Sequence, residues 1–216
     1  MKQLTLLTNK LINNYYIQKK RFKFKFFINI FFSILKKIIK SKERRLHHMT
    51  KSLIICYSRT GQNYVNGNII ELKRGNGEII VDYITELTDA DTFHVETLKE
   101  YPIDYMQTTE VAQEELNNNT RPELKEELTD ISEYDVIYIV SPNWWGTLPM
   151  AMFTQLEKLD FTDKIVKTLI THEGSGLGNS MNDIKKLCEG ADIKKGLAIH
   201  GAKVKSSKAD VERWIE

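Results

Sequence analysis

The sequence has few cysteines, so it offers little opportunity for disulfides, cysteine-rich metal sites or dithiol redox motifs. Its 216 residues include only two cysteines, Cys56 and Cys188, and no Cys-x-x-Cys motif. Because Cys56 falls in an apolar run typical of a core strand, we expect no disulfide, and a reducing, cytoplasmic location fits this usage. His94 has no metal-ligand partner near it in the sequence and is expected to be a surface or half-buried strand residue. We therefore predict no metal site and no catalytic side chain.

Two common motifs, one catalytic and one cofactor-binding, are also missing around Ser175 and the neighbouring glycines. A nucleophile elbow needs glycine two positions before and two after the serine, but Glu173 and Leu177 stand there. A dinucleotide-binding GxGxxG motif would need glycine at position 179, which is Asn179. The serine-hydrolase and dinucleotide-fold classes are therefore not favoured.

Long hydrophobic runs are absent from the basic N-terminal segment, residues 1–48. Its uncharged apolar run, Phe26–Leu35, has ten residues, whereas about 18 are needed to span a bilayer. Basic residues follow this run, beginning at Lys36-Lys37, instead of a small-residue cleavage site. Three interpretations stay open: an upstream extension before a true start at Met49, a basic membrane-surface segment, or a cleaved signal peptide. Membrane contact is expected only if residues 1–48 are present in the protein.

Charge divides the chain into two parts. Residues 1–48 carry 13 of the 31 basic residues and one of the 29 acidic residues, so residues 49–216 carry 18 and 28 and have a net charge of −10. An acidic body argues against nucleic-acid binding and suits a protein that meets basic redox partners. We expect a leader over residues 1–48 and one folded domain over residues 49–216.

The hydrophobic pattern of residues 49–216 alternates between strands and helices. Leu53–Tyr57 and Asp135–Ser141 are apolar without alternation, which is typical of parallel strands buried on both faces. The succession of strand and helix patterns along the chain predicts a doubly wound α/β fold with helices on both faces of a five-stranded parallel sheet. Strands are expected at Leu53–Tyr57, Thr92–Thr97, Asp135–Ser141, Ile165–Thr171 and Lys195–His200, and helices at about Asn76–Leu87, Met106–Leu116, Ala151–Leu159, Ser180–Leu187 and Ser207–Glu216.

A small polar loop with Ser58, Thr60 and Gly61 follows the first strand, at the carboxyl end where open α/β sheets bind ligands. Hydroxyls and backbone N–H groups of a tight turn can hold a phosphate, and Gly61 allows close approach. The next residues, Gln62–Arg74, contain an Asn66-Gly67 pair that predicts a tight hairpin beside this site.

The segment Ser58-Arg59-Thr60-Gly61 resembles the FMN-phosphate loop of flavodoxins, which usually reads Ser/Thr-x-Thr-Gly-Asn-Thr and continues directly into a helix. In one interpretation the insertion Gln62–Arg74 splits this loop, so that Gly75-Asn76 resumes the family pattern and Gly77 replaces the usual threonine. The helix N-terminus would still offer N–H donors to the phosphate. In the other interpretation, Gly75–Gly77 is only a turn before the helix. The resemblance implies a three-layer flavodoxin-like fold with strand order 2-1-3-4-5 and FMN as the cofactor.

Two further loops follow strands at the same edge. Trp144 and Trp145 are adjacent, so they cannot both point into one core layer, and at least one is expected at the surface or against a ligand. The alternative is that one packs on the next helix while the other fills a gap. Pro-x-Trp-Trp-Gly resembles the loop beside the isoalloxazine in a bacterial branch of the flavodoxins. His172 and Glu173 are neighbours on an extended chain and should point apart, so we expect loop residues rather than an acid–base pair.

The expected FMN-binding residues come from all three loops. They are Ser58, Arg59, Thr60, Gly61, Asn76, Gly77, Pro142, Asn143, Trp144, Trp145, Gly146, Thr147, Thr171, His172, Glu173, Gly174 and Gly176.

Three functions remain compatible with the sequence. The first is an FMN-binding electron carrier that exchanges electrons with a redox partner protein, which the acidic body favours by analogy. The second is an FMN-dependent enzyme that uses NAD(P)H to reduce quinones or similar small acceptors, which the insertion favours because a flap can shape a substrate pocket. The third is a flavodoxin-fold scaffold without cofactor, which gains weight from Gly77 in place of threonine.

Overall fold

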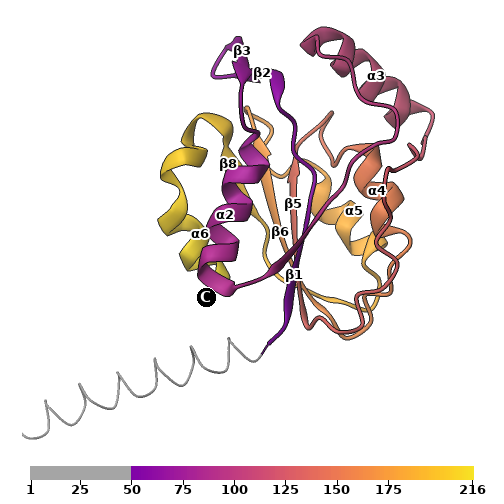
Figure 1. Ribbon diagram of the computed structural model, residues 1–216, viewed down its shortest axis with the longest axis vertical. Helices are drawn as coiled ribbons and strands as arrows, with labels where there is room; N and C mark the ends of the chain where they lie inside the picture. Colours follow the sequence, from indigo (N-terminus) through magenta and orange to yellow (C-terminus); the bar gives the residue numbers. More distant parts are fainter. Residues whose placement is uncertain (1–49) are drawn as a thin grey trace, which may run out of the picture. The chain divides into compact units, whose positions relative to one another are not determined.

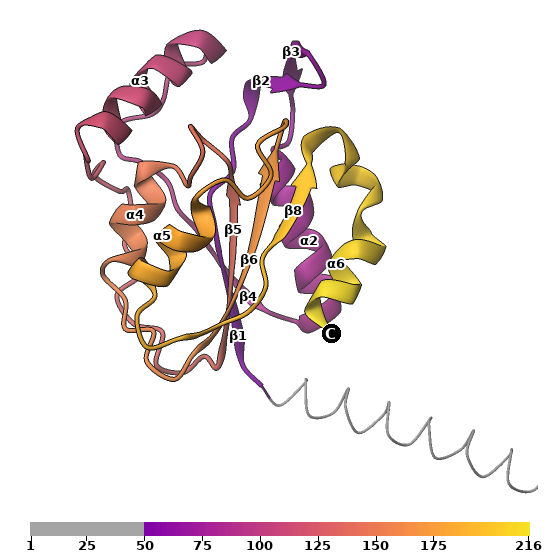
Figure 2. The same cartoon turned by 180° about the vertical axis from the view of Figure 1, so that it is seen from behind.

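The computed structural model describes residues 50–216, and in this region a parallel sheet is covered on both faces by helices (Figures 1 and 2). The interpretations of the leader and of a start at Met49 concern residues outside the described range. Among the described residues, no helix has the length and apolar character needed to cross a membrane.

The sheet has the predicted order. From one edge it runs β4 (Asp91–His94), β1 (Ser52–Cys56), β5 (Val136–Pro142) and β6 (Ile165–His172), followed by β7 (Asp192–Ile193) and β8 (Leu197–His200), which both pair with β6. All these pairings are parallel. With β7 and β8 taken as one interrupted strand, the order is 2-1-3-4-5 and the flavodoxin-like fold is confirmed.

Two strands differ from their expected extents by more than one residue at an end. The fifth strand is divided into β7 and β8, and between them the Lys195 carbonyl accepts a hydrogen bond from Trp214 Nε1 at 3.0 Å. The second strand ends at His94 and not at Thr97, because Thr97 forms an antiparallel bridge with Leu124.

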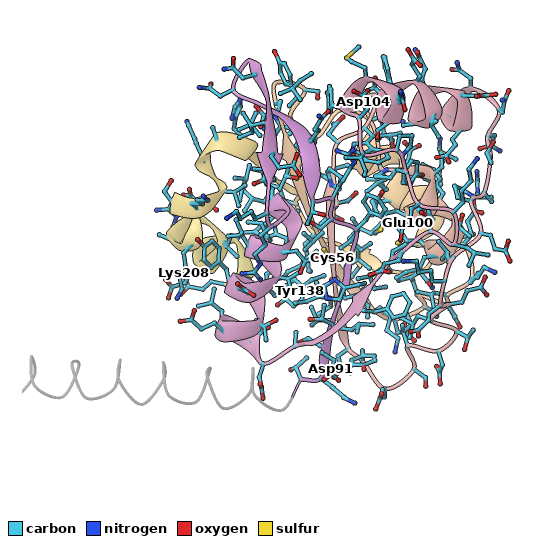
Figure 3. All side chains as sticks on the ribbon, turned by 45° about the horizontal axis from the view of Figure 1, so that its top comes forward. Cys56, Asp91, Glu100, Asp104, Tyr138 and Lys208 are labelled. Atoms are coloured by element: carbon cyan, nitrogen blue, oxygen red, sulfur yellow. The ribbon has the colours of Figure 1, made fainter. Side chains whose placement is uncertain are left out.

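Strand β1 is apolar without alternation because both of its faces are buried. Leu53 and Ile55 pack in a cluster with residues of α4 (Met150–Leu156) and α5 (Ser180–Leu187). Ile54 and Cys56 pack on the other face with residues of α2 (Asn76–Thr88) and α6 (Lys208–Ile215). Both sheet faces therefore exclude water. Cys56 and Tyr138 are buried, whereas the charged side chains of Asp91, Glu100, Asp104 and Lys208 reach the surface; all six are labelled in Figure 3.

The insertion forms the predicted hairpin, β2 (Gly61–Val65) and β3 (Asn68–Leu72), joined by Asn66 and Gly67 with φ of 48° and 89°. Such positive φ values at both turn positions are what an Asn-Gly hairpin turn requires. The hairpin stands beyond the carboxyl edge of the sheet, as does α3 (Tyr105–Asn117), which β2 contacts (Figure 1). A short 3-10 helix, η1 (Gly201–Ser206), links β8 to α6.

Candidate functional site

The carboxyl ends of β1, β5 and β6 open onto a cavity of about 310 Å³. Its walls come from the loops after these three strands, the start of α2, the hairpin and the start of α3. The expected site residues that line it are Ser58, Arg59, Asn76, Gly77, Pro142, Asn143, Trp144, Thr171, His172, Glu173 and Gly174.

At one end of the cavity, the first turn of α2 lies directly against Ser58. The Ser58 Oγ accepts a hydrogen bond from the Glu78 N–H at 3.3 Å. A Cβ at Gly75 would lie 2.1 Å from this oxygen, and a Cβ at Gly77 would lie 2.9 Å from the Ser58 Cβ. Only glycine therefore permits this approach. We call Ser58 and Gly75–Gly77 the cradle; it brings together the two halves of the loop, as the split-loop interpretation requires.

The cradle has the properties of an anion site. Gly75 is the N-cap of α2 and provides no side-chain cap, so N–H groups of the first turn remain for a ligand. The helix dipole favours negative charge at this end. Asn76 and Gly77 of this turn line the cavity.

Arg59 connects the first loop to the segment before α3. Its guanidinium donates hydrogen bonds to the Pro102 carbonyl at 2.8 Å, the Ile103 carbonyl at 2.9 Å and the Thr108 Oγ1 at 3.1 Å. Partial burial lowers the pKa of Arg59 below its ordinary value. Its donors are thus directed largely at the protein itself, although the side chain lines the cavity.

Thr60 and Gly61 are not among the residues lining this cavity. They border a neighbouring hollow together with Glu100 and Tyr101. The insertion causes this separation, because Gly61 already belongs to β2 and leads away into the hairpin.

The two tryptophans have different environments. Trp144 lines the cavity and packs edge-on against Tyr57 and Tyr101, with ring centroids 5.3 and 5.1 Å away. Trp145 is 51% exposed, and its Nε1 donates to the Thr109 carbonyl at 2.9 Å. The φ of 52° at Trp145 turns the chain between them. The expectation that one indole would lie at the surface is confirmed.

Several expected ligand residues instead hold the second and third loops together. The Asn143 side chain donates to the Gly176 carbonyl at 3.1 Å and accepts from the Gly146 N–H at 3.0 Å. The Thr147 hydroxyl donates to the buried Asp183 carboxylate at 2.6 Å. Gly146, Thr147 and Gly176 are not among the cavity-lining residues.

His172 and Glu173 do not pair with each other. The Glu173 Oε2 accepts a hydrogen bond from the Asn66 N–H at the hairpin tip, at 2.8 Å, and lies 3.6 Å from the Nε2 of His200. The His172 Nδ1 accepts from the Gly174 N–H at 3.0 Å. Burial and, secondarily, the nearby His200 lower the pKa of His172. Glu173 therefore connects the third loop to the hairpin.

The hairpin and α3 contribute cavity residues that were not predicted from the sequence. Asn63, Tyr64 and Leu72 of the hairpin and Tyr105 of α3 line the cavity, as does Ser175. The rings of Tyr64 and Tyr105 stack with centroids 6.1 Å apart and planes at 23°. The hairpin was expected beside the site, but its contact with α3 depends on tertiary packing that local sequence does not encode.

The comparisons with known proteins agree with this arrangement. A family model described as Flavodoxin matches residues 72–216. The chain belongs to the flavodoxin family. The matched flavodoxin segment begins at the last residue of the hairpin and includes the start of α2 and the second and third loops of the cavity. No curated protein matches the chain.

Solved structures share the flavodoxin fold at low identity. A protein from Bacteroides uniformis ATCC 8492, provisionally classed as a flavoprotein, has a TM-score of 0.60 at 24% identity and covers 77% of this chain and 97% of its own. The complex of a Lactobacillus acidophilus NCFM flavoprotein with FMN has a TM-score of 0.54 at 19% identity, covering 77% and 99% respectively. At these identities the likeness establishes the fold alone.

Proposed function

We propose that the protein binds FMN non-covalently in this cavity and carries electrons on it. The observation that carries the proposal is the cradle, a helix N-terminus that only glycine allows to reach Ser58 at the wall of a cavity. A flavoprotein of the same fold has been solved in complex with FMN.

The residues present fit a flavin mononucleotide. The cradle presents the Ser58 hydroxyl and helix N–H groups suited to the phosphate. Trp144 and Tyr105 bring aromatic rings to the same cavity, and such surfaces favour a planar ring system. When bound, FMN supplies the electron or hydride transfer, and the protein binds it, orients it and limits its access to water.

The electron-carrier function also involves a partner. The body of the chain has a net charge of −10, which attracts a basic redox partner protein over long range and speeds their encounter. Both cysteines are buried and free, and a cytoplasmic location is part of the proposal because a reducing compartment keeps thiols in this state.

The test is titration of the full chain with FMN and with riboflavin, followed by flavin fluorescence and absorbance. We expect FMN to bind more tightly than riboflavin, because only FMN has a phosphate for the cradle. Ser58→Ala should weaken FMN binding about tenfold through loss of a charge-assisted hydrogen bond and leave riboflavin binding unchanged. Ser206→Ala, on the exposed side of η1, is the matched control. A protein that binds neither flavin, or both equally, would contradict the proposal.

A second cavity favours an alternative function, an NAD(P)H-dependent reductase of quinones or similar acceptors. It has a volume of about 380 Å³ and shares Arg59, Asn63, Tyr105, Asn143 and Trp144 with the first cavity. Met106, Ala112 and Trp145 add apolar surface to it. A planar acceptor held there would lie beside a flavin in the first cavity.

The two functions differ in kinetics and spectra. A carrier should form a stable one-electron reduced flavin on photoreduction and oxidise NAD(P)H slowly, whereas an enzyme should oxidise NAD(P)H steadily with a quinone. Thr109→Phe adds a ring at the second cavity and should lower kcat/KM of an enzyme about tenfold, a loss of about 1.4 kcal/mol of transition-state stabilisation. Glu110→Phe, one position along α3 and outside this lining, is the control.

A further inference from the structure

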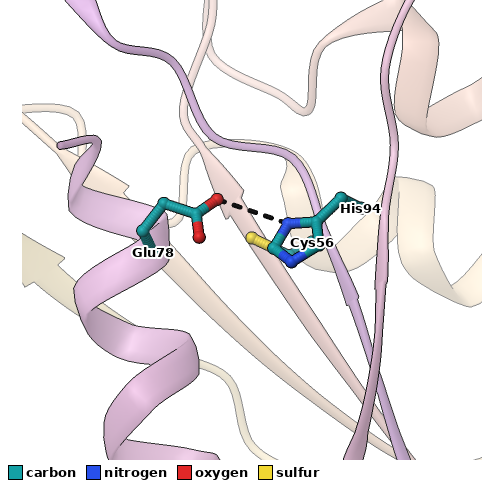
Figure 4. A group of neighbouring side chains, drawn as sticks. All are labelled: Cys56, Glu78 and His94. Carbon is teal, nitrogen blue, oxygen red and sulfur yellow. Dashed lines mark ion pairs between the residues drawn. The ribbon is translucent and has the colours of Figure 1, made fainter.

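Behind the cradle, three potential metal ligands come together from β1, α2 and β4. Cys56 of β1 and His94 of β4 are paired in register on neighbouring parallel strands, so their side chains leave the sheet on the same face. That face is covered by α2, and Glu78 in its first turn lies over both residues (Figure 4).

The side chains converge. One ligand atom from each of Cys56, Glu78 and His94 lies within 4.8 Å of the other two. His94 Nδ1 and Glu78 Oε1 are 3.3 Å apart. The sulfur is fully buried, whereas the His94 and Glu78 side chains are 44% and 28% exposed. An ion can therefore enter from the surface, between the imidazole and the carboxylate, and reach the thiol at the inner end.

We propose that Cys56, Glu78 and His94 bind one divalent transition-metal ion of the zinc type, with water as the fourth ligand. Thiolate, imidazole and carboxylate are the ligands that zinc uses in proteins, and a sulfur ligand disfavours magnesium and calcium. Tetrahedral bonds of about 2.0–2.3 Å place ligand atoms roughly 3.5 Å apart. The two partly exposed side chains have to move inward by only a small distance to reach this geometry.

The site imposes one proton step. Burial and, secondarily, the charge of Glu78 raise the pKa of the Cys56 thiol well above its usual value, so the free protein holds the thiol protonated. Metal binding forms the metal–sulfur bond and releases this proton to water. No oxidant or reductant is involved.

Glu78 belongs to both neighbouring sites. Its carboxylate faces His94, while its backbone N–H donates to the Ser58 Oγ of the cradle. A bound ion would fix the first turn of α2 to strands β1 and β4. The metal site itself does not depend on FMN binding.

The test is titration of the full chain with Co²⁺, recorded as difference spectra against the metal-free protein. We expect one equivalent to produce a sulfur-to-cobalt charge-transfer band and the visible bands of four-coordinate cobalt, and Zn²⁺ to displace it one for one. Cys188→Ala, which removes the other buried cysteine, should retain these bands, whereas Cys56→Ala should lose the charge-transfer band.

Variants at two partly exposed positions test the site even if the Cys56 variant fails to fold. His94→Gln and Glu78→Gln should each weaken Co²⁺ binding by about tenfold or more. Absence of a charge-transfer band in the wild-type protein, its persistence in Cys56→Ala, or unchanged cobalt affinity in both glutamine variants would overturn the proposal. FMN titration of the same samples is a separate readout, so failure of one site is distinguishable from failure of the other.

Discussion

The two ends of the main cavity are held in different ways. At the cradle, backbone and side chain are in direct contact, and there is no space for a Cβ at Gly75 or Gly77. At the hairpin, Tyr64, Ile69 and Ile70 are 41%, 48% and 41% exposed, and a hydrogen bond from Asn66 to Glu173 anchors the tip. The closely packed cradle has few alternative conformations, whereas the exposed hairpin can adjust its conformation when a side chain is changed. We therefore expect substitutions at the cradle to weaken FMN binding strongly and substitutions in the hairpin to change it little.

The largest effect is expected from Gly75→Ala. Its Cβ would lie 2.1 Å from Ser58 Oγ and 2.7 Å from the Arg59 carbonyl oxygen, and such overpacking lowers the free energy of unfolding by about 1–3 kcal/mol. FMN affinity should fall by roughly 100-fold, or about 2.7 kcal/mol, because the cradle must open. Urea denaturation and FMN titration measure the two effects.

Gly67→Ala at the hairpin tip is the comparison for Gly75→Ala. A Cβ there meets nothing within 4 Å, but φ is 89°, so the cost is about 1–2 kcal/mol of backbone strain. FMN affinity should stay almost unchanged. Equal FMN affinities in the two variants would show that the cradle is not the phosphate site.

The next largest effect is expected from Asp183→Ala. Its Oδ2 accepts hydrogen bonds from Thr147 Oγ1 at 2.6 Å and Asn179 Nδ2 at 2.9 Å. Losing bonds to a buried carboxylate should lower the free energy of unfolding by about 1.5–3 kcal/mol. Asp192→Ala, at an exposed carboxylate that pairs with Lys194, should cost less than about 1 kcal/mol. If both variants lose the same free energy of unfolding in chemical denaturation, the bond between Asp183 and Thr147 does not stabilise the second loop.

Substitutions of the adjacent tryptophans should also have unequal effects on the free energy of unfolding, with a smaller maximum loss. Trp144→Ala removes edge contacts with Tyr57 and Tyr101 and should lower the free energy of unfolding by about 2 kcal/mol, less than a fully buried tryptophan. Trp145→Ala should change it by only about 0.5 kcal/mol, because the indole is 51% exposed. The reverse order in urea denaturation would contradict the assignment of Trp144 to the inner wall.

The smallest effect concerns His172 and pH. Its pKa in the folded protein is below the ordinary value of 6.5, so above pH 6.5 it is neutral in both states and contributes nothing. As the pH falls below 6.5, the unfolded chain binds a proton that the folded protein resists, and the free energy of unfolding decreases. Denaturation midpoints measured across this range should depend less on pH in His172→Asn. Identical slopes would show that His172 is not responsible.

The sequence predicted what depends on local pattern. Continuous apolar runs marked β1 and β5, and the Asn-Gly pair marked the hairpin turn, because burial on two faces and positive φ leave clear signals in composition. The convergence of three loops followed from one rule, that parallel strands end at the same sheet edge.

The remaining features arise from pairing between distant segments. Cys56 and His94 are 38 positions apart in the sequence but occupy paired positions on adjacent strands, which no local spacing reveals. The contact of Tyr64 with Tyr105 likewise depends on the direction in which the hairpin folds. The hydrogen bond from Trp214 in the last helix to the Lys195 carbonyl, between β7 and β8, is another contact between distant segments.

The pairing of Gly61 with Leu72 closes the base of the hairpin. Because the chain enters and leaves at adjacent points, this segment is a removable module: a short linker in its place would rejoin the flanking chain without displacing the sheet. The family match begins at Leu72, so the rest of the hairpin lies outside the matched segment. Exchanging it for hairpins of other lengths or compositions would give a series of proteins with one cofactor pocket and different entrances.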